Sequence, residues 1–330
     1  MDSPVAFFAA AAAPLADGRV LITGGRDGAD DKPVNAAFIL DTRSLTIQPT
    51  KAMSTQRAYH TATTLADGRV LIVGDGSAEL FDPHLPSFSP IVAPTLSHRA
   101  QAAALLGDGT VLIAGGVDST DSITAAAERF DPKTQVFRPA GAMSEPKVNA
   151  TALSLPTGDV VVVGGHTIET FSIKAGAFLS PIPIQGAVDP AAVALPDGRV
   201  LLVGGLDSTA ASQPRKGDTG IPASQDITLF DPATSTFRRV GQMSTARYEA
   251  GAVLIDNNRV LVTGGMRDSH EDAGLIDSAE TIDIATWATA MVGPMHEARF
   301  YHVSVLSGGR IAVIGSPTSN PHTSVDVFIP

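Results

Sequence analysis

Two strings of four residues contain an arginine, a tyrosine and a histidine in the same order. They are residues 57–60 (Arg-Ala-Tyr-His) and residues 299–302 (Arg-Phe-Tyr-His). Neutral imidazole is a common ligand of transition metals, and a phenolate can complete the same site. The pattern therefore nominates His60 and His302 as metal ligands. The alternative is that both histidines pack inside the fold in a structural role.

Basic residues recur at a second, related spacing, four positions after a methionine. The residues at these positions are Arg57, Lys147, Arg247 and Arg299, and Arg99 follows Leu96 by three positions. Cations gathered on one rim would bind a carboxylate, a sulfate or an acidic peptide, and arginine can do so through two hydrogen bonds. The alternative is that each cation pairs with an aspartate or glutamate of the neighbouring blade, because a buried arginine needs a partner.

Other polar residues occupy matching places along the chain and complete a candidate ligand-binding set. The full set is Arg57, Tyr59, His60, Arg99, Gln101, Lys147, Asn149, Asp189, Arg247, Tyr248, Glu249, Arg299, Tyr301 and His302. These side chains make a mixed polar surface and no recognisable catalytic group, so the set favours a binding protein over an enzyme.

Four longer segments are rich in acids, at residues 26–35, 117–125, 206–225 and 266–278. The acids are Asp27, Asp30, Asp31, Asp118, Asp121, Asp207, Asp268, Glu271, Asp272 and Asp277. Calcium binds several such oxygens in one cage, but no segment has the spacing of a twelve-residue EF-hand loop. A structural calcium ion and a solvated acidic rim both remain open. Segments of this length in a compact domain are usually functional or disordered.

The elements that position these residues belong to a repeat that runs through the whole chain. A short apolar run ending in Gly-Gly or a near variant occurs seven times, with starts at residues 20, 70, 111, 160, 200, 260 and 311. Each run predicts a strand buried on both faces. An Asp-Gly or similar pair before it predicts a two-residue hairpin turn of type I′, and a strand of small residues precedes that turn. Repeats of about 40–50 residues made of strands indicate the blades of a propeller.

The repeats resemble those of the kelch family of β-propellers over essentially the whole chain. The double glycine, an acid in the third strand (Glu79, Glu128, Glu169, Glu280 and Asp326) and a later aromatic residue carry the resemblance. It implies an all-β fold, a single domain over residues 1–330 and a seven-bladed propeller of mostly four-stranded antiparallel blades. The expected blades span approximately residues 1–50, 51–92, 93–140, 141–183, 184–240, 241–292 and 293–330. The last blade is expected to have three strands, unless a segment preceding Met1, which could have held an export signal, was lost or removed.

The Arg-x-Tyr-His strings also resemble the copper-ligand segment of galactose and glyoxal oxidases, whose catalytic domains are kelch propellers. Their radical cofactor requires a cysteine joined to a tyrosine, and this chain has no cysteine. Their last histidine ligand comes from a further domain, which has no counterpart here. The resemblance therefore does not extend to radical copper oxidase activity.

The composition excludes other classes of partner. The formal charge is −11 with an isoelectric point near 5.1, which argues against binding nucleic acid or an anionic membrane. No apolar run reaches the ~18 residues of a membrane-spanning helix. The absence of cysteine fits a periplasmic or secreted protein, and a cytoplasmic location remains open. The degenerate repeats look like those of bacterial kelch proteins, many of which are exported, and we expect a monomer.

Three functions are consistent with these observations. The first is a binding module that holds an acidic peptide, a protein or a glycan on the loop face at the channel mouth, with no cofactor. The second is an enzyme acting on a small anionic carbohydrate, as in kelch-type sialic acid epimerases, with Arg247, Glu249, His60 and His302 as acid–base candidates. The third is a metal-binding propeller that uses the two Tyr-His pairs. The fold does not decide among them, because propellers host all three.

Overall fold

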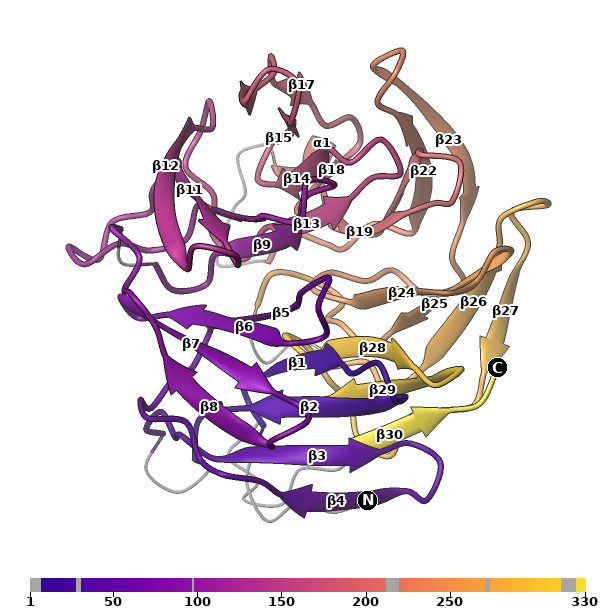
Figure 1. The fold of residues 1–330 in the computed structure, drawn as a ribbon. Helices are drawn as coiled ribbons and strands as arrows, with labels where there is room; N and C mark the ends of the chain where they lie inside the picture. The colour runs from indigo at the N-terminus through magenta and orange to yellow at the C-terminus, as the bar shows by residue number, and fades with distance from the viewer. Residues whose placement is uncertain (1–6, 28–30, 97, 212–219, 271–273, 316–324) are drawn as a thin grey trace.

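Seven antiparallel sheets are arranged around a central axis in the computed structural model (Figure 1). The structure describes residues 7–27, 31–96, 98–211, 220–270, 274–315 and 325–330. Blade 1 has β1 (Ala11–Pro14), β2 (Arg19–Thr23), β3 (Ala37–Asp41) and β4 (Thr46–Pro49). Blade 2 has β5 (Thr61–Thr64), β6 (Val70–Gly74), β7 (Ser77–Asp82) and β8 (Ser87–Pro90). Blade 3 has β9 (Ala102–Leu105), β10 (Val111–Ala114), β11 (Ala126–Asp131) and β12 (Val136–Ala142).

The other four blades follow in chain order. Blade 4 has β13 (Thr151–Ser154), β14 (Val160–Gly164), β15 (Thr167–Ser172) and β16 (Ala177–Phe178), and β17 (Ile182–Pro183) also pairs with β15. Blade 5 has β19 (Ala191–Ala194), β20 (Val200–Val203), β22 (Asp226–Asp231) and β23 (Thr236–Gln242), and blade 6 has β24 (Gly251–Asp256), β25 (Arg259–Thr263), β26 (Ala279–Asp283) and β27 (Thr289–Val292). Blade 7 has β28 (Val303–Ser307), β29 (Arg310–Ile314) and β30 (Val325–Phe328). The only described helix, α1 (Ser208–Ala211), and the short ladder of β18 (Ala187–Val188) with β21 (Leu206–Asp207) lie outside these sheets.

The structure confirms the expected seven-bladed propeller, with three strands in the last blade among the described residues. The innermost strands contact one another in sequence around the axis, and β28 contacts β1 to complete the circle. The described helix is not long or apolar enough to cross a membrane.

The core is divided into seven apolar clusters, one at each interface between neighbouring blades. The second strand of every blade supplies side chains to the clusters on both of its faces, which explains its continuous apolar run. At the junction of blades 7 and 1, Phe7 packs with residues of both blades, including Val20 and Ile314. The Ser307 hydroxyl also donates to the Arg19 carbonyl oxygen at 2.8 Å. Side-chain packing and such hydrogen bonds therefore hold this junction together.

The hairpin of blade 7 agrees with the predicted type I′ turn, because Gly308 and Gly309 have φ of 60° and 76° between the paired Ser307 and Arg310. The hairpin of blade 1 differs from it. In blade 1, Gly18 has a positive φ of 88° but Asp17 does not, and Gly18 N donates to Leu15 O at 3.0 Å. This is a turn in which only the glycine needs the left-handed region. The aspartate acts through its side chain instead, because Asp17 Oδ1 accepts from Arg19 N at 3.0 Å. The prediction of a hairpin was correct, and that of the type I′ turn was wrong for blade 1 and agrees with blade 7.

Candidate functional site

The segment that enters each inner strand has the same backbone conformation in all seven blades. One residue per blade has a φ of about +50° in this segment, two positions before the inner strand. These residues are Ala9, Tyr59, Ala100, Asn149, Asp189, Glu249 and Tyr301. We call the segment before each inner strand the entry segment. The positive-φ residues align the seven entry segments, so the residues two positions before them occupy equivalent places in the seven blades.

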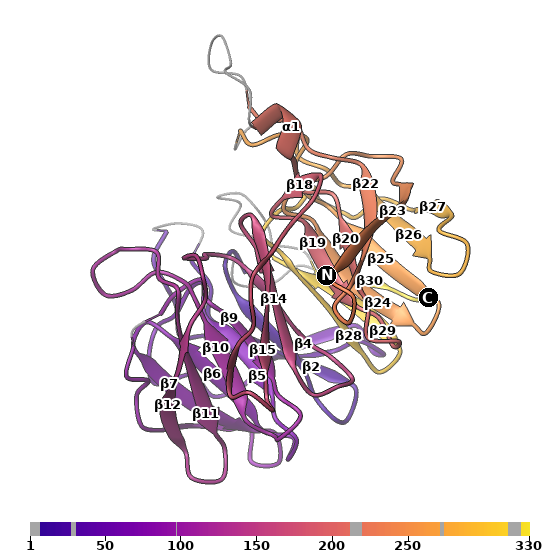
Figure 2. The same ribbon diagram turned by 90° about the horizontal axis from the view of Figure 1, so that it is seen from above.

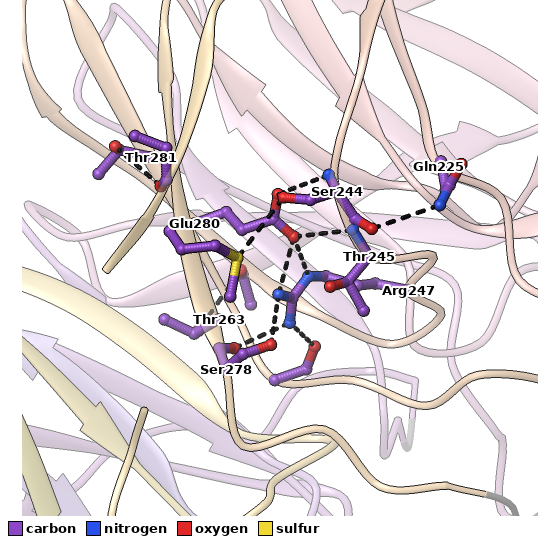
Figure 3. A network of polar contacts seen from close by, with 12 residues as sticks. Gln225, Ser244, Thr245, Arg247, Thr263, Ser278, Glu280 and Thr281 are labelled. Atoms are coloured by element: carbon purple, nitrogen blue, oxygen red, sulfur yellow. Dashed lines mark hydrogen bonds and ion pairs between the residues drawn. The ribbon is translucent and has the colours of Figure 1, made fainter. Parts of the chain in front are cut away.

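That earlier position is basic in five blades and completely enclosed. The residues there are Arg57, His98, Lys147, Arg247 and Arg299, each at most 2% exposed. In blade 6, Arg247 Nη1 donates to Gly264 O at 2.8 Å, and Nη2 donates to Glu280 Oε1 at 3.0 Å (Figure 3). Each of the other four makes the same two kinds of contact, with the carbonyl of a glycine after the second strand and with the acid of the third strand.

The geometry therefore follows the alternative given for the basic residues, in which each cation pairs with an acid. The expected blade of the acid was wrong, since the acid belongs to the cation's own blade and not to the neighbouring one. Glu280 also accepts hydrogen bonds from Ser244 N and Ser244 Oγ. Burial acts to raise the pKa of Glu280, but the hydrogen bonds from Ser244 and Arg247 outweigh it and lower that pKa. These cations lie beneath the surface that a ligand would meet.

In blade 3 the prediction that Arg99 is equivalent to the other basic residues was wrong. His98, not Arg99, occupies the enclosed position, and its Nδ1 lies 2.6 Å from Gly115 O. Arg99 is exposed on the rim, where its Nη2 lies 2.6 Å from Asp121 Oδ1. In four other blades the basic residue was found by counting four positions from a methionine. Blade 3 has no such methionine, and counting from Leu96 selected Arg99 instead of His98.

Blades 1 and 5 replace both partners of the buried pair together. In blade 1 the cation and acid positions hold Phe7 and Phe38, whose rings meet edge to face with centroids 5.6 Å apart. In blade 5 they hold Ala187 and Thr228. The paired replacement indicates that a cation and an acid occur at these two positions only together, as a structural pair.

The two histidines nominated as metal ligands lie in separate interfaces between blades. His60 Nε2 is 2.8 Å from Thr23 Oγ1 of blade 1, and His302 Nε2 is 2.8 Å from Thr263 Oγ1 of blade 6. Threonine occupies this strand position only in the two blades that precede a histidine. Within the described chain no group of three His, Asp or Glu side chains could hold a metal. Metal binding by either residue stays a prediction.

Both imidazoles are neutral in this environment. Burial, followed by the positive charge of Arg57, lowers the pKa of His60 to about 3. Burial, followed by the charges of Arg299 and Arg247, lowers the pKa of His302 to about 3. Neither ring can donate a proton at neutral pH as a general acid.

Backbone hydrogen bonds link the positive-φ residues of successive blades around half of the mouth. Tyr59 N donates to Ala9 O at 2.9 Å, Ala100 N donates to Tyr59 O at 2.7 Å, and Asn149 N donates to Ala100 O at 2.9 Å. The chain of bonds stops there, because Asp189 N donates to Gly165 O instead. The blades that follow leave a space at the centre.

That space is a pocket of about 290 Å³ between blades 4 and 7. Its lining includes Asn149, Asp189, Tyr248, Glu249, Tyr301 and His302, together with small and aliphatic residues such as Val148, Thr151, Pro190 and Ala250. Because these residues precede the inner strands, the pocket opens on the face from which the long loops leave. Its volume is at the low end of the ~300–1,000 Å³ typical of ligand pockets.

All three tyrosines of the chain gather at this mouth. Tyr248 and Tyr301 line the pocket, and Tyr59 occupies the matching position in blade 2. Phenylalanine, by contrast, is placed mainly in the core. Tyrosine combines a large apolar ring with a hydroxyl, and it is enriched at binding sites for that reason.

Acids set the electrostatics of the pocket. Burial, and then the charges of Glu249 and Asp189, raise the pKa of Tyr248 above its ordinary value. Burial and a hydrogen bond to Glu249 raise the pKa of Tyr301 in the same direction. Both phenols therefore stay protonated and can donate hydrogen bonds.

The structure thus brings together six of the predicted site residues and separates the others. Asn149, Asp189, Tyr248, Glu249, Tyr301 and His302 share the pocket. Gln101 is buried and donates to Val73 O of the preceding blade at 2.7 Å. The apolar lining residues were not predicted, since small residues at strand starts carry no chemical signal. Ligand binding by any of these residues stays a prediction.

The long loops of blades 5 and 6 are joined into one wall beside the pocket. Ala223 N donates to Arg267 O at 2.8 Å, and Ser269 N donates to Ile221 O at 2.9 Å. Figure 2 shows α1 and β18 at this end of the molecule.

The loop acids that the structure describes mostly close their own turns or pair with arginine. Asp118 Oδ1 accepts from Thr120 N at 2.8 Å, Asp207 Oδ1 accepts from Thr209 N at 2.8 Å, and Asp31 lies 3.0 Å from Arg26. Asp30, Glu271 and Asp272 lie outside the described residues. A calcium site stays a prediction.

Replacing Glu280 with glutamine should destabilise the fold by about 3 kcal/mol or more, because it leaves the enclosed charge of Arg247 without its counter-charge. Urea denaturation measures the change. Asp256→Asn, which removes the exposed pair with Arg259 (both side chains 43% exposed), is the matched control and should cost less than about 1 kcal/mol. Equal effects of the two substitutions would contradict this account of the buried pair.

The low pKa values of His60 and His302 predict a stability that falls as the pH is lowered from 7 to 5. An unfolded histidine titrates near pH 6.5, whereas the folded rings titrate at about 3. Between these values the unfolded chain binds protons that the folded chain does not, so acidification favours unfolding. Urea denaturation at both pH values measures the slope.

The double variant His60→Gln, His302→Gln is the control for this slope. Glutamine is the natural choice, because Gln101 occupies the equivalent position in blade 3 and bonds to the preceding blade. The variant should remain folded with a smaller dependence on pH. An unchanged slope would show that other groups cause it.

Comparison with known proteins agrees with the architecture. The kelch motif matches residues 98–144 and again residues 187–244. No curated protein sequence matches the chain. Among solved structures, a fungal alcohol oxidase of the AA5 family in complex with copper is similar, with a TM-score of 0.79 and 18% identity over 100% of this chain and 75% of that one. At this identity the likeness shows the fold alone, and together with the motifs and the seven blades it identifies the chain as a kelch-repeat β-propeller.

Proposed function

We propose that the protein is a ligand-binding module and that its site is the pocket between blades 4 and 7. The observation that carries this proposal is the gap in the ring of positive-φ residues, where two tyrosines and two acids line one cavity. Kelch repeats generally mediate interactions, which is consistent with a binding role.

A glycan suits this lining better than an acidic peptide. The prediction of an acidic peptide depended on the basic residues, and four of them are enclosed and paired with acids. The pocket instead offers phenol donors, carboxylate acceptors and the Asn149 amide, whose Nδ2 lies 3.4 Å from the Tyr301 hydroxyl. Sugars present many hydroxyl groups and an apolar ring face, and both fit tyrosine.

The enzymatic alternative has weaker geometric support. Of its four acid–base candidates, Arg247 is bound to Glu280, His60 lies between blades, and the His302 imidazole has a pKa of about 3. Glu249 alone among them is an acid in the pocket. The four predicted candidates therefore leave one usable carboxylate, and an acid–base pair for epimerisation would depend on Asp189, which was not among them.

A glycan array probed with the purified protein tests the proposal. Tyr301→Ala should weaken binding to any glycan found by at least about tenfold, as expected for a central aromatic contact. Tyr59→Ala is the control, because Tyr59 packs on Phe8 and Arg26 outside the pocket lining. Circular dichroism establishes that both variants fold. Binding that survives Tyr301→Ala, or that Tyr59→Ala abolishes equally, would contradict the assignment of the site.

A further inference from the structure

We infer that the ligand of the mouth pocket carries an ammonium group, which Glu249 and Asp189 receive between the rings of Tyr248 and Tyr301. The inference rests on the proposed function and goes further, since it names the chemical group that gives the pocket its selectivity. It is argued from the charges, the aromatic rings and the size of the cavity.

The charges of the pocket lining are all negative. Among the described residues that line it, Asp189 and Glu249 are acids and none is a lysine or an arginine. His302 is neutral at physiological pH, as its pKa of about 3 requires. A ligand with a positive group would therefore enter a site of complementary charge, and an anionic ligand would be repelled.

The cations beneath the pocket do not reverse this balance. Lys147 Nζ lies 2.7 Å from Glu145 and 3.7 Å from Glu169, so that two acids face one ammonium group. Arg247 and Arg299 are each paired with one acid. Each cation below the pocket thus has a carboxylate partner, and although the charges of Arg299 and Arg247 still act on His302, Asp189 and Glu249 are the charged side chains that line the cavity itself.

The aromatic rings supply the second element of an ammonium site. A cation is attracted to the face of a tyrosine ring, more strongly where water is excluded. Tyr248 and Tyr301 line the cavity with the acids, and Glu249 hydrogen-bonds to both phenols. The same mouth already holds such a contact between blades 1 and 2, where the Arg26 guanidinium lies 5.5 Å from the centre of the Tyr59 ring.

The cavity size limits what can carry the ammonium group. A volume of about 290 Å³ accommodates one monosaccharide or one long side chain. An amino sugar and a lysine side chain both present a primary ammonium group on a partly apolar body. The shared chemistry is this group, and the probes below separate its two sources.

Isothermal titration with three sugars of the same ring tests the inference: D-glucosamine, D-glucose and N-acetyl-D-glucosamine. They differ only at C2, where they carry an ammonium, a hydroxyl and a neutral amide. Glucosamine should bind at least about tenfold more tightly than the other two, as one charge-assisted hydrogen bond provides. Its advantage should shrink at high salt, and also at a pH where the amine has lost its proton.

Substitutions that remove charge without changing shape locate the effect. Glu249→Gln and Asp189→Asn should each weaken the binding of glucosamine by a larger factor than the binding of glucose, so that most of the advantage of glucosamine is lost. Asn149 has the same backbone conformation as Asp189, so asparagine fits this position. Asp197→Asn is the control, since Asp197 pairs with Arg199 at the hairpin on the opposite face of blade 5.

The outcomes separate this inference from the proposed function. Equal binding of all three sugars, lost in Tyr301→Ala, would overturn the ammonium inference and keep the binding site. Nα-acetyl-lysine amide and its Nε-acetylated form are the second matched pair. Binding of the charged form alone, without any sugar, would support the inference with a peptide as the source. If neither glucosamine nor the lysine probe binds at millimolar concentration, the inference is wrong whatever the glycan array shows.

Discussion

The buried contact between the entry segment and the third strand is the constraint on which the rest of this propeller depends. An enclosed cation bonds at once to the carbonyl after the second strand and to the acid of the third strand. An unpaired charge in this place would cost several kcal/mol, so both partners must be present together or absent together. Blade 1 obeys the same rule with Phe7 on Phe38, and blade 5 does so with Ala187 and Thr228. The contact fixes each entry segment on its own blade.

The shape of the mouth follows from that constraint. Once the entry segment is fixed, the residue two positions later has a positive φ in every blade. Hydrogen bonds between these residues close the side from Ala9 to Asn149, and the pocket opens where the bonds stop. The repeat thus builds a uniform rim, and the proposed binding site lies where the hydrogen bonds of this rim are interrupted. The joined loops of blades 5 and 6 raise the wall beside it.

The fold could be predicted from the sequence because the buried second strand of each blade appears as an apolar run that repeats along the chain. Runs such as Val160–Gly164 are apolar at each position because both faces are covered. The site was harder to predict, since the same arginine could be an exposed ligand or an enclosed anchor, and spacing alone does not distinguish them. Arg57 and Arg247 are enclosed, whereas the neighbouring Tyr248 and Glu249 reach the pocket. The predicted alignment of blade 3 was wrong for a similar reason. His98 occupies the enclosed position there and contacts the Gly115 carbonyl, as an arginine does in other blades.

The residue types at the positive-φ positions argue that the mouth serves more than folding. Asparagine and aspartate tolerate the left-handed region comparatively well, and they occupy it at Asn149 and Asp189. Tyrosine and glutamate have no such local advantage, yet they are found at Tyr59, Glu249 and Tyr301. Ala9 and Ala100 show that a small residue satisfies the backbone there. Tyr59 packs on Phe8 and Arg26 within the fold, whereas Glu249 and Tyr301 line the pocket, so at these two positions the costly conformation supports the proposed binding site.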